Sequence, residues 1–302
     1  MKRLLIILSV LVLSSANLLA QTGKEKRYAS NYDVLKYLPK QSDHDPATFW
    51  KSITQNNTEF QKNAKKFENP KGLAKKAESE VMNAAYRNSI LRNMTRRTEE
   101  DIELCNIIRY LMLGDEQSEM EFEVIDHWEP NAYCTPDGYV CIYTGIIERL
   151  EGNVDLMSGV IAHEIAHYMY KHALILRHKT LKKERENQIG AAIHHAGVGF
   201  LDVPNKDQMI QNIYDNAELQ TNQYRYKYSR KEEVEADVVA YRFLDWMGID
   251  PENMSIALRR IAPFGPLDEE HDDDDHPSFV FRLGVLSALK PAFYNNTQGS
   301  QP

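Results

Sequence analysis

The chain has 302 residues, of which 42% are hydrophobic and 26% charged, and its formal net charge is −8. This length and composition exclude a wholly disordered chain and allow one or two globular domains. The acidic balance argues against nucleic acid or an anionic membrane as a partner, because both require clustered Lys and Arg.

The first twenty residues predict a secretory signal peptide. Lys2 and Arg3 precede an apolar run, Leu4–Leu13, and small residues follow it up to Ala20. The alternative is a membrane anchor, but this run is short for a spanning helix, which needs roughly twenty apolar residues. We therefore expect removal of residues 1–20 and export of the mature protein to the periplasm or outside the cell. No later segment is long and apolar enough to predict a transmembrane helix.

Three cysteines are too few for a disulfide scaffold. Cys134 and Cys141 flank a predicted turn at residues 135–138, so they either pair or remain as thiols, and the sequence leaves both readings open. Their spacing is not that of a zinc site.

The first half of the chain predicts helices followed by short strands. Residues 21–95 form a polar lead-in and then helices rich in Lys, Glu, Ala and Asn. Thr98 is placed to cap a helix that ends at Gly114. The period then changes, and short strands are predicted over Phe122–Ile125 and Tyr139–Tyr143.

The second half predicts long helices. One begins after Asn153 and is expected to continue past His172. A charged helical stretch over residues 174–186 leads into an apolar segment over residues 189–200, which we expect to be buried or to face a partner. A second helix is predicted from Ser229 to Trp246, and another starts at Pro251. Residues 268–275 form an acidic loop, and residues 294–302 a disordered tail. The whole predicts an α+β, mainly helical fold with its main domain at residues 96–293.

The motif that carries chemistry is His163-Glu164-Ile165-Ala166-His167. Residues four apart lie on one face of a helix, so His163 and His167 can hold one zinc ion through their imidazole nitrogens. Glu164 can then reach the zinc-bound water and take its proton. Two histidines on a solvated helix face are the alternative, but a buried stripe through Ile165 argues against a fully exposed face.

A catalytic zinc site needs a third protein ligand. The metzincin extension fails, because Tyr170 and Ala173 stand where it requires Gly and His. Glu233 and Asp237 are four residues apart on the predicted second helix, so one can bind the metal while the other accepts a hydrogen bond from a ligating imidazole. Spacing leaves open which does which. Glu232 and Glu235 are expected to point into solvent.

Three blocks of the chain, in order, resemble the gluzincin peptidases that include the HtpX heat-shock protease, the CAAX prenyl endopeptidase and the periplasmic BepA-like proteases. The matching residues are Asn131-Ala132, Pro136–Tyr139 and Thr144-Gly145 before the motif; Ser229-Arg230 and Glu233–Asp237; and His276-Pro277 with Arg282. The resemblance covers about residues 120–290 and implies a zincin-like domain with a small sheet beside the active-site helix.

The resemblance also implies roles for individual residues. Glu233 is implied to be the third zinc ligand, Asp237 its neighbour that orients a histidine, and Glu164 the general base. The strand that starts at Tyr139 is implied to border the cleft, where a peptide could add as an extra strand. His276 is implied to lie near the metal, either stabilising the oxyanion or plugging the cleft, and Arg282 is a further cleft candidate.

The chain departs from that family in three respects. Asp137-Gly138 replaces the usual Gly-Gly, no transmembrane helices match those of the HtpX and prenyl-protease branches, and residues 269–275 look like an insertion. Prenylated substrates are therefore not expected. The acidic insertion either binds a divalent cation or is a solvated charge run, which is the more common outcome.

Taken together, the sequence predicts an exported, zinc-dependent endopeptidase with one Zn²⁺ per chain. Its expected substrates are unfolded or misassembled proteins, a class implied by the resemblance. The alternative is a binding or chaperone-like module that uses the same cleft without turnover.

Overall fold

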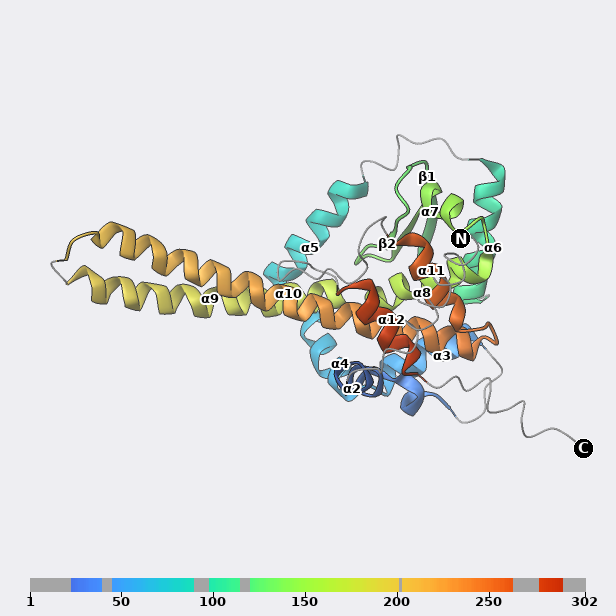
Figure 1. Cartoon of the computed structure of the whole chain (residues 1–302), viewed down its shortest axis with the longest axis horizontal. Helices are drawn as coiled ribbons and strands as arrows, with labels where there is room; N and C mark the ends of the chain where they lie inside the picture. The colour runs from blue at the N-terminus through green and yellow to red at the C-terminus, as the bar shows by residue number, and fades with distance from the viewer. Residues whose placement is uncertain are drawn as a thin grey trace, which may run out of the picture.

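A computed structural model describes residues 23–39, 45–89, 98–114, 120–200, 203–262 and 277–289 (Figure 1). The predicted signal peptide, acidic loop, disordered tail and His276 lie outside these residues. The described part is mainly helical with one small sheet, as the sequence predicted.

The N-terminal helices cover the body from outside. In chain order they are α2 (Gly23–Tyr32), α3 (Pro46–Gln55), α4 (Thr58–Ala64) and α5 (Leu73–Ser89), with short 3-10 turns at Val34–Tyr37 and Lys65–Phe67. Phe49 and Trp50 of α3 insert into the core, where the Trp50 ring stacks on Phe243 at 4.9 Å between centroids. These aromatic contacts attach α3 to the long helix that contains Phe243.

Helix α6 (Glu99–Leu113) begins and ends as predicted. Thr98 accepts a hydrogen bond from the Asp101 amide, and the Asp101 carboxylate accepts one from the Thr98 amide, which completes a capping box. Gly114 ends the helix with a φ of +68°, a conformation that side-chain-bearing residues adopt at a cost.

The sheet has three strands in the order β1–β3–β2, formed by Glu121–Ile125, Tyr139–Tyr143 and Ala132–Cys134. β3 is parallel to β1 and antiparallel to β2. The predicted turn joins β2 to β3, and the Gly138 amide donates to the Thr135 carbonyl at 2.9 Å. β2 was not predicted, because three residues are too few to show an alternating pattern. It forms the edge of the sheet that lies nearest to α8.

The three cysteines form no disulfide in the described residues. In the register of β2 and β3, Cys134 lies opposite Val140, whereas Cys141 lies opposite Tyr133. Since adjacent residues of a strand point to opposite faces of the sheet, Cys134 and Cys141 face away from each other. This settles the question that the sequence left open.

The motif helix is shorter than predicted. After α7 (Thr144–Arg149), α8 runs over Val154–Met169, and Asn153 caps it by accepting a hydrogen bond from the Leu156 amide at 3.0 Å. The expectation that it continues past His172 was wrong, because Lys171 adopts a left-handed conformation with a φ of +54°. The next helix, α9 (His172–Gly199), begins directly after this break.

Helices α9 and α10 (Lys206–Trp246) form an antiparallel pair whose distal half projects from the body as an arm (Figure 1). The charged stretch and the apolar segment predicted from the sequence are a single helix, α9. α10 starts at Lys206 rather than at the predicted Ser229. The early start was missed because these turns are rich in Asn, Gln and Asp, although Ile210, Ile213 and Ala217 keep a helical apolar period. Its C-terminal end at Trp246 agrees with the prediction.

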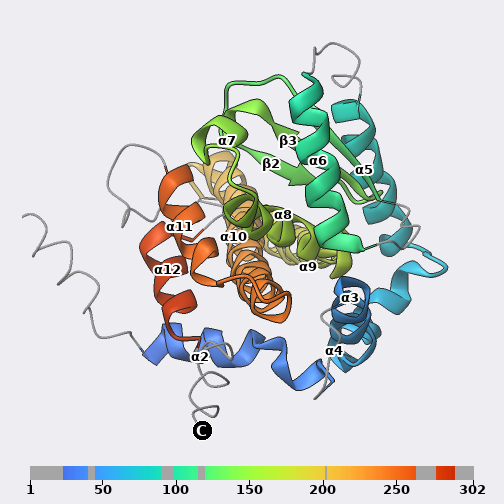
Figure 2. The ribbon, with the colours of Figure 1, turned by 90° about the vertical axis from the view of Figure 1, so that its right-hand side faces the viewer.

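Helices α8 and α10 occupy the middle of the body, and the other elements surround them (Figure 2). The sheet and α6 lie on one side. α11 (Glu252–Ile261), which starts after Pro251 as predicted, and α12 (Phe279–Ser287) lie on another. Within the described ranges, none of the helices combines the length and the apolar character that spanning a bilayer requires.

Candidate metal centre

Helix α8 brings His163 and His167 together. Both imidazoles point from the same face of the helix, and their Nε2 atoms are 3.1 Å apart. His163 is buried, and Ile161 and Ile165 on the same helix are buried in the core. The reading of two histidines on a solvated face is therefore wrong for this pair.

Helix α10 supplies the carboxylate. Glu233 is buried, with Oε1 3.2 Å from Nε2 of His167 and Oε2 3.5 Å from Nε2 of His163. One ligand atom from each of the three residues lies within 4.8 Å of the other two. Two imidazole nitrogens and one carboxylate are the donor set of a catalytic zinc site, and they leave a fourth position open. The geometry thus selects Glu233, which spacing could not separate from Asp237.

Asp237 supports the first histidine from behind. Its Oδ1 lies 2.8 Å from Nδ1 of His163, and the guanidinium of Arg282 donates to both its oxygens at 2.7 Å. Burial raises the pKa of Asp237, but the adjacent Arg282 outweighs it and the net shift is downward, so the carboxyl stays ionised. A carboxylate on Nδ1 places the hydrogen there and leaves Nε2 free to bind metal.

A cavity of about 390 Å³ opens in front of the three candidate ligands. Glu164 faces it, and its Oε2 accepts a hydrogen bond from the Cys134 amide of β2 at 3.3 Å. Burial raises the pKa of Glu164 above its ordinary value. The cavity lining comprises residues 131–136 of β2 and its flanks, together with His163, Glu164, His167, Tyr168, Lys171, Ala173, Leu174 and Glu233.

Comparison with known proteins decides the family. The model of peptidase family M48 matches residues 95–290, about two thirds of the chain. This chain belongs to peptidase family M48. The expectation of a gluzincin metallopeptidase family is confirmed.

The chain is also similar to a curated metalloprotease. The chain is 24% identical over 159 residues to the metalloprotease LoiP of Escherichia coli (strain K12), a match that covers 50% of this chain and 55% of the relative. The chain therefore matches only about half the length of that relative. No solved structure matches significantly.

The second histidine of this M48 site has a support that the sequence did not predict. His172, the first residue of α9, places its Nδ1 3.0 Å from Nδ1 of His167 and its Nε2 3.4 Å from a carboxylate oxygen of Glu235. If His167 binds metal through Nε2, its Nδ1 hydrogen points to His172, which in turn can donate to Glu235. The sequence signal that could have revealed this support is a third histidine, five residues after His167. It was overlooked because the helix break at Lys171 was not predicted.

The expectation that Glu232 and Glu235 point into solvent was wrong. Glu232 is 8% exposed, and Glu235 is half-buried beside His172. Both line a second cavity of about 490 Å³ between α10, α9 and the N-terminal helices. Desolvation raises the pKa of Glu232 well above its ordinary value. The N-terminal helices α2 and α4 cover the face of α10 that carries Glu232 and Glu235. The sequence of α10 alone predicts that this face is exposed to solvent.

The implied position of the cleft strand needs correction. Tyr139 belongs to β3, the central strand, which is paired on both edges and cannot accept a further strand. Its side chain is buried against Ile125 and Cys141 and is not among the described residues that line the cavity. β2 lies at the cleft instead. Arg282 is likewise behind the site, where it binds Asp237.

Proposed function

We propose that this M48 family member is a zinc-dependent endopeptidase. The observation that carries the proposal is the cluster of two Nε2 atoms and one buried carboxylate, with Glu164 beside it in a cavity bordered by an edge strand. His163, His167 and Glu233 would hold the zinc ion, which would supply a Lewis acid for peptide hydrolysis.

Glu164 is the general base in this proposal. It faces the cavity without being one of the three candidate metal ligands, and its Oε1 lies 4.0 Å from Nε2 of His163. In hydrolysis it takes the proton of the attacking water and returns it to the leaving amine. The Cys134 amide holds the carboxylate by its other oxygen.

The substrate is an extended peptide segment, bound beside β2. Residues 131–136 line the cavity, and the Cys134 amide points away from β3, as its hydrogen bond to Glu164 requires. A segment that adds to an edge strand must be extended, which favours unfolded or misassembled proteins over compact ones. The basic and apolar start of the chain supports export to the periplasm or beyond.

A Glu164→Gln variant tests the catalytic proposal. The amide cannot take a proton, so cleavage of a permanently unfolded test protein should fall by roughly 10²–10⁴-fold. Zinc content should stay at the wild-type value, and a strong chelator should abolish wild-type cleavage. Loss is read by gel densitometry over time.

The matched control is Glu148→Gln, the same change at an exposed position of α7, which should cleave like the wild type. Cleavage by Glu164→Gln at the wild-type rate would refute the role of Glu164. Binding of the test protein without any chelator-sensitive cleavage by the wild type would favour the alternative, a binding module.

A further inference from the structure

The outer face of α9 carries a repeating seam in the arm. Its members alternate at spacings of four and three residues over Lys182, Glu186, Ile189, Ile193, Ala196 and Phe200. This is the spacing of the a and d positions of a heptad, which places all six on one stripe about 27 Å long. The last four are apolar, and from Gln188 to Gly199 the helix has no Lys, Arg, Asp or Glu.

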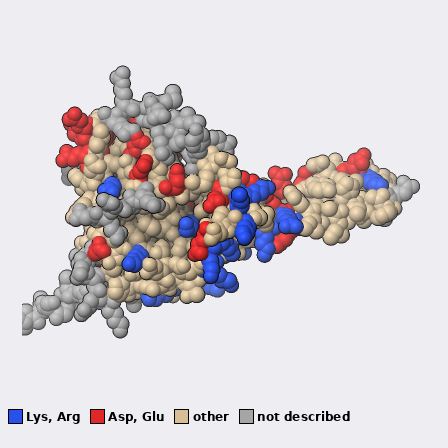
Figure 3. Space-filling model, turned by 180° about the vertical axis from the view of Figure 1, so that it is seen from behind, with Lys and Arg blue, Asp and Glu red and all other residues tan. Residues whose placement is uncertain are grey.

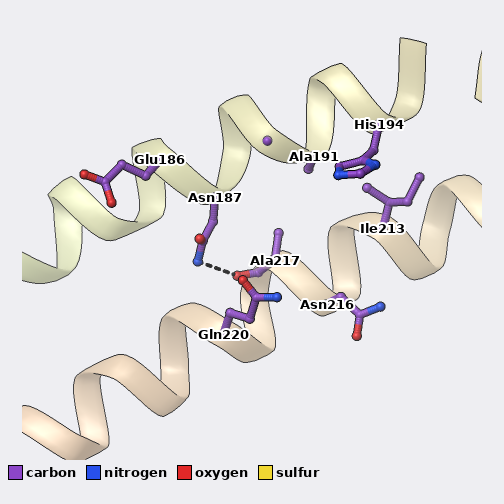
Figure 4. Close-up of a pocket in the computed structure, with 9 residues that line it drawn as sticks. Glu186, Asn187, Ala191, His194, Ile213, Asn216, Ala217 and Gln220 are labelled. Carbon is purple, nitrogen blue, oxygen red and sulfur yellow. Dashed lines mark hydrogen bonds between the residues drawn. The ribbon is translucent and has the colours of Figure 1, made fainter. Parts of the chain in front are cut away.

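The seam is on the opposite side of α9 from α10. Asn187 and Ala191 face α10, where the Asn187 amide donates to the Ala217 carbonyl at 3.2 Å (Figure 4). Ile189, Ile193 and Phe200 are 54%, 68% and 91% exposed. Such large apolar side chains, aligned along one face, are unusual on a surface that meets only water.

The arm stands clear of the body. In the described residues no other element packs on its distal half, and Figure 1 shows it projecting past every other helix. Figure 3 shows Lys and Arg gathered at the base of the arm, whereas most of its distal half carries no charge on the face shown. Two packed helices bury only the faces that they turn to each other, so the outer stripe of α9 is left uncovered by the described residues.

We propose that two copies of this chain pair through this seam, α9 against antiparallel α9, about a two-fold axis between Ile189 and Ile193. In that register Ile189 meets the partner's Ile193, and Glu186 lies opposite the small side chain of the partner's Ala196. The two arms then form a four-helix layer, with α10 of each copy on the outside.

The ends of the seam complement each other in this register. Lys182 falls opposite the partner's Phe200, so its stem covers the ring and its ammonium can approach the ring face. The carboxyl end of the partner's α9, where the helix dipole is negative, comes over the same lysine. A parallel pairing would instead bring like ends together and leave both Phe200 rings beside each other at the tips.

A lipid surface fits the arm less well than a second copy does. Lys182 and Glu186 continue the apolar stripe, and α10 places Asp207, Asp215 and Glu218 along the same distal half. Against these three carboxylates the described distal half, residues 188–220, carries one basic residue, Lys206, so it lacks the Lys and Arg that hold an amphipathic helix on a lipid surface. The second copy is therefore the occupant that the charges favour.

Self-association of the full chain tests the seam. Sedimentation velocity should show a concentration-dependent dimer for the wild type. Ile193→Glu places a carboxylate at the centre of the seam and should weaken the dimer by about tenfold or more. Gln188→Glu adds the same charge to an exposed position off the seam and should leave the dimer unchanged. Circular dichroism should be equal for all three proteins, because both positions are exposed.

Cysteine substitution tests the register. When Ile189→Cys and Ile193→Cys chains are mixed and oxidised, the antiparallel pairing predicts the mixed 189–193 disulfide over either same-site disulfide. Peptide mass mapping distinguishes it from any product of the three native cysteines.

Three results would overturn the proposal: a monomeric wild type, a dimer that Ile193→Glu leaves intact, or same-site disulfides in excess. Cosedimentation of a monomeric wild type with phosphatidylcholine vesicles, lost in Ile193→Glu, would overturn it in favour of lipid. None of these results bears on the metal centre, so pairing and proteolysis can fail independently.

Discussion

Helix α10 belongs to two regions that are stabilised differently. In its C-terminal half, Glu233 and Asp237 are buried in the body, and Asp237 is bound by both a guanidinium and an imidazole. In its N-terminal half the same helix lies beside α9 in the open arm, where most side chains remain partly in water. Removing the partner of a buried charge in the body should therefore lower the free energy of unfolding strongly. Removing a contact in the arm should lower it only slightly.

The two candidate ligand histidines within the body also differ. His163 has a direct carboxylate, Asp237, whose Oδ1 lies 2.8 Å from its Nδ1. His167 reaches its carboxylate, Glu235, only through His172. The first histidine is thus held directly by a buried carboxylate, and the second by a relay that reaches a cavity at the back of the site.

The largest effect on stability is expected at Arg282. Arg282→Met leaves Asp237 as a buried carboxylate without its guanidinium, which should lower the free energy of unfolding by about 3–5 kcal/mol. Urea denaturation followed by circular dichroism measures the loss. Combining Arg282→Met with Asp237→Asn removes both charges and should restore part of it. A single variant as stable as the wild type would show that the body does not depend on this pair.

A smaller effect is expected at His172, measured on metal rather than on folding. His172→Leu removes the hydrogen-bond partner of His167 and should weaken zinc binding by about 10–100-fold. Competition with a chromogenic chelator gives the affinity. His178→Leu, a change at a half-buried histidine further along α9 that packs against Phe67, is the matched control and should bind zinc like the wild type. Equal losses in both variants would point to a general disturbance of α9.

The smallest effect is expected in the arm. Asn187 donates to the Ala217 carbonyl and to the Thr221 hydroxyl, at 3.2 and 2.9 Å. Asn187→Ala should lower the free energy of unfolding by about 1 kcal/mol. The loss is small because both hydrogen bonds are only partly buried, so that water can replace the Asn187 amide as the donor. Zinc binding should not change. A loss as large as that of Arg282→Met would remove the distinction between the two regions.

Local signals in the sequence were sufficient for much of the fold and for the pair of histidines on α8. The cap at Thr98, the turn ending at Gly138 and the stop after Trp246 follow from the conformational preferences of a few adjacent residues. His163 and His167 follow from helical spacing. Glu233 came from the family resemblance, and the geometry then agreed with it.

What failed depended on distant segments. The burial of Glu232 results from the N-terminal helices that pack over α10, and the relay from His172 to Glu235 results from the left-handed turn at Lys171. The length of the arm was missed because the first half of α10 is rich in Asn, Gln and Asp and has only a narrow apolar stripe, at Ile210, Ile213 and Ala217. These features arise from tertiary packing, which a pattern in one segment does not report.

The zinc content of purified variants tests the central claim most directly. Wild-type protein should contain one zinc per chain, measured by inductively coupled plasma mass spectrometry after dialysis. Glu233→Gln should lose the metal, whereas Glu232→Gln, the same change at the adjacent buried position, should retain it. Equal zinc content in these two variants, or its absence from the wild type, would contradict a metal centre formed by His163, His167 and Glu233.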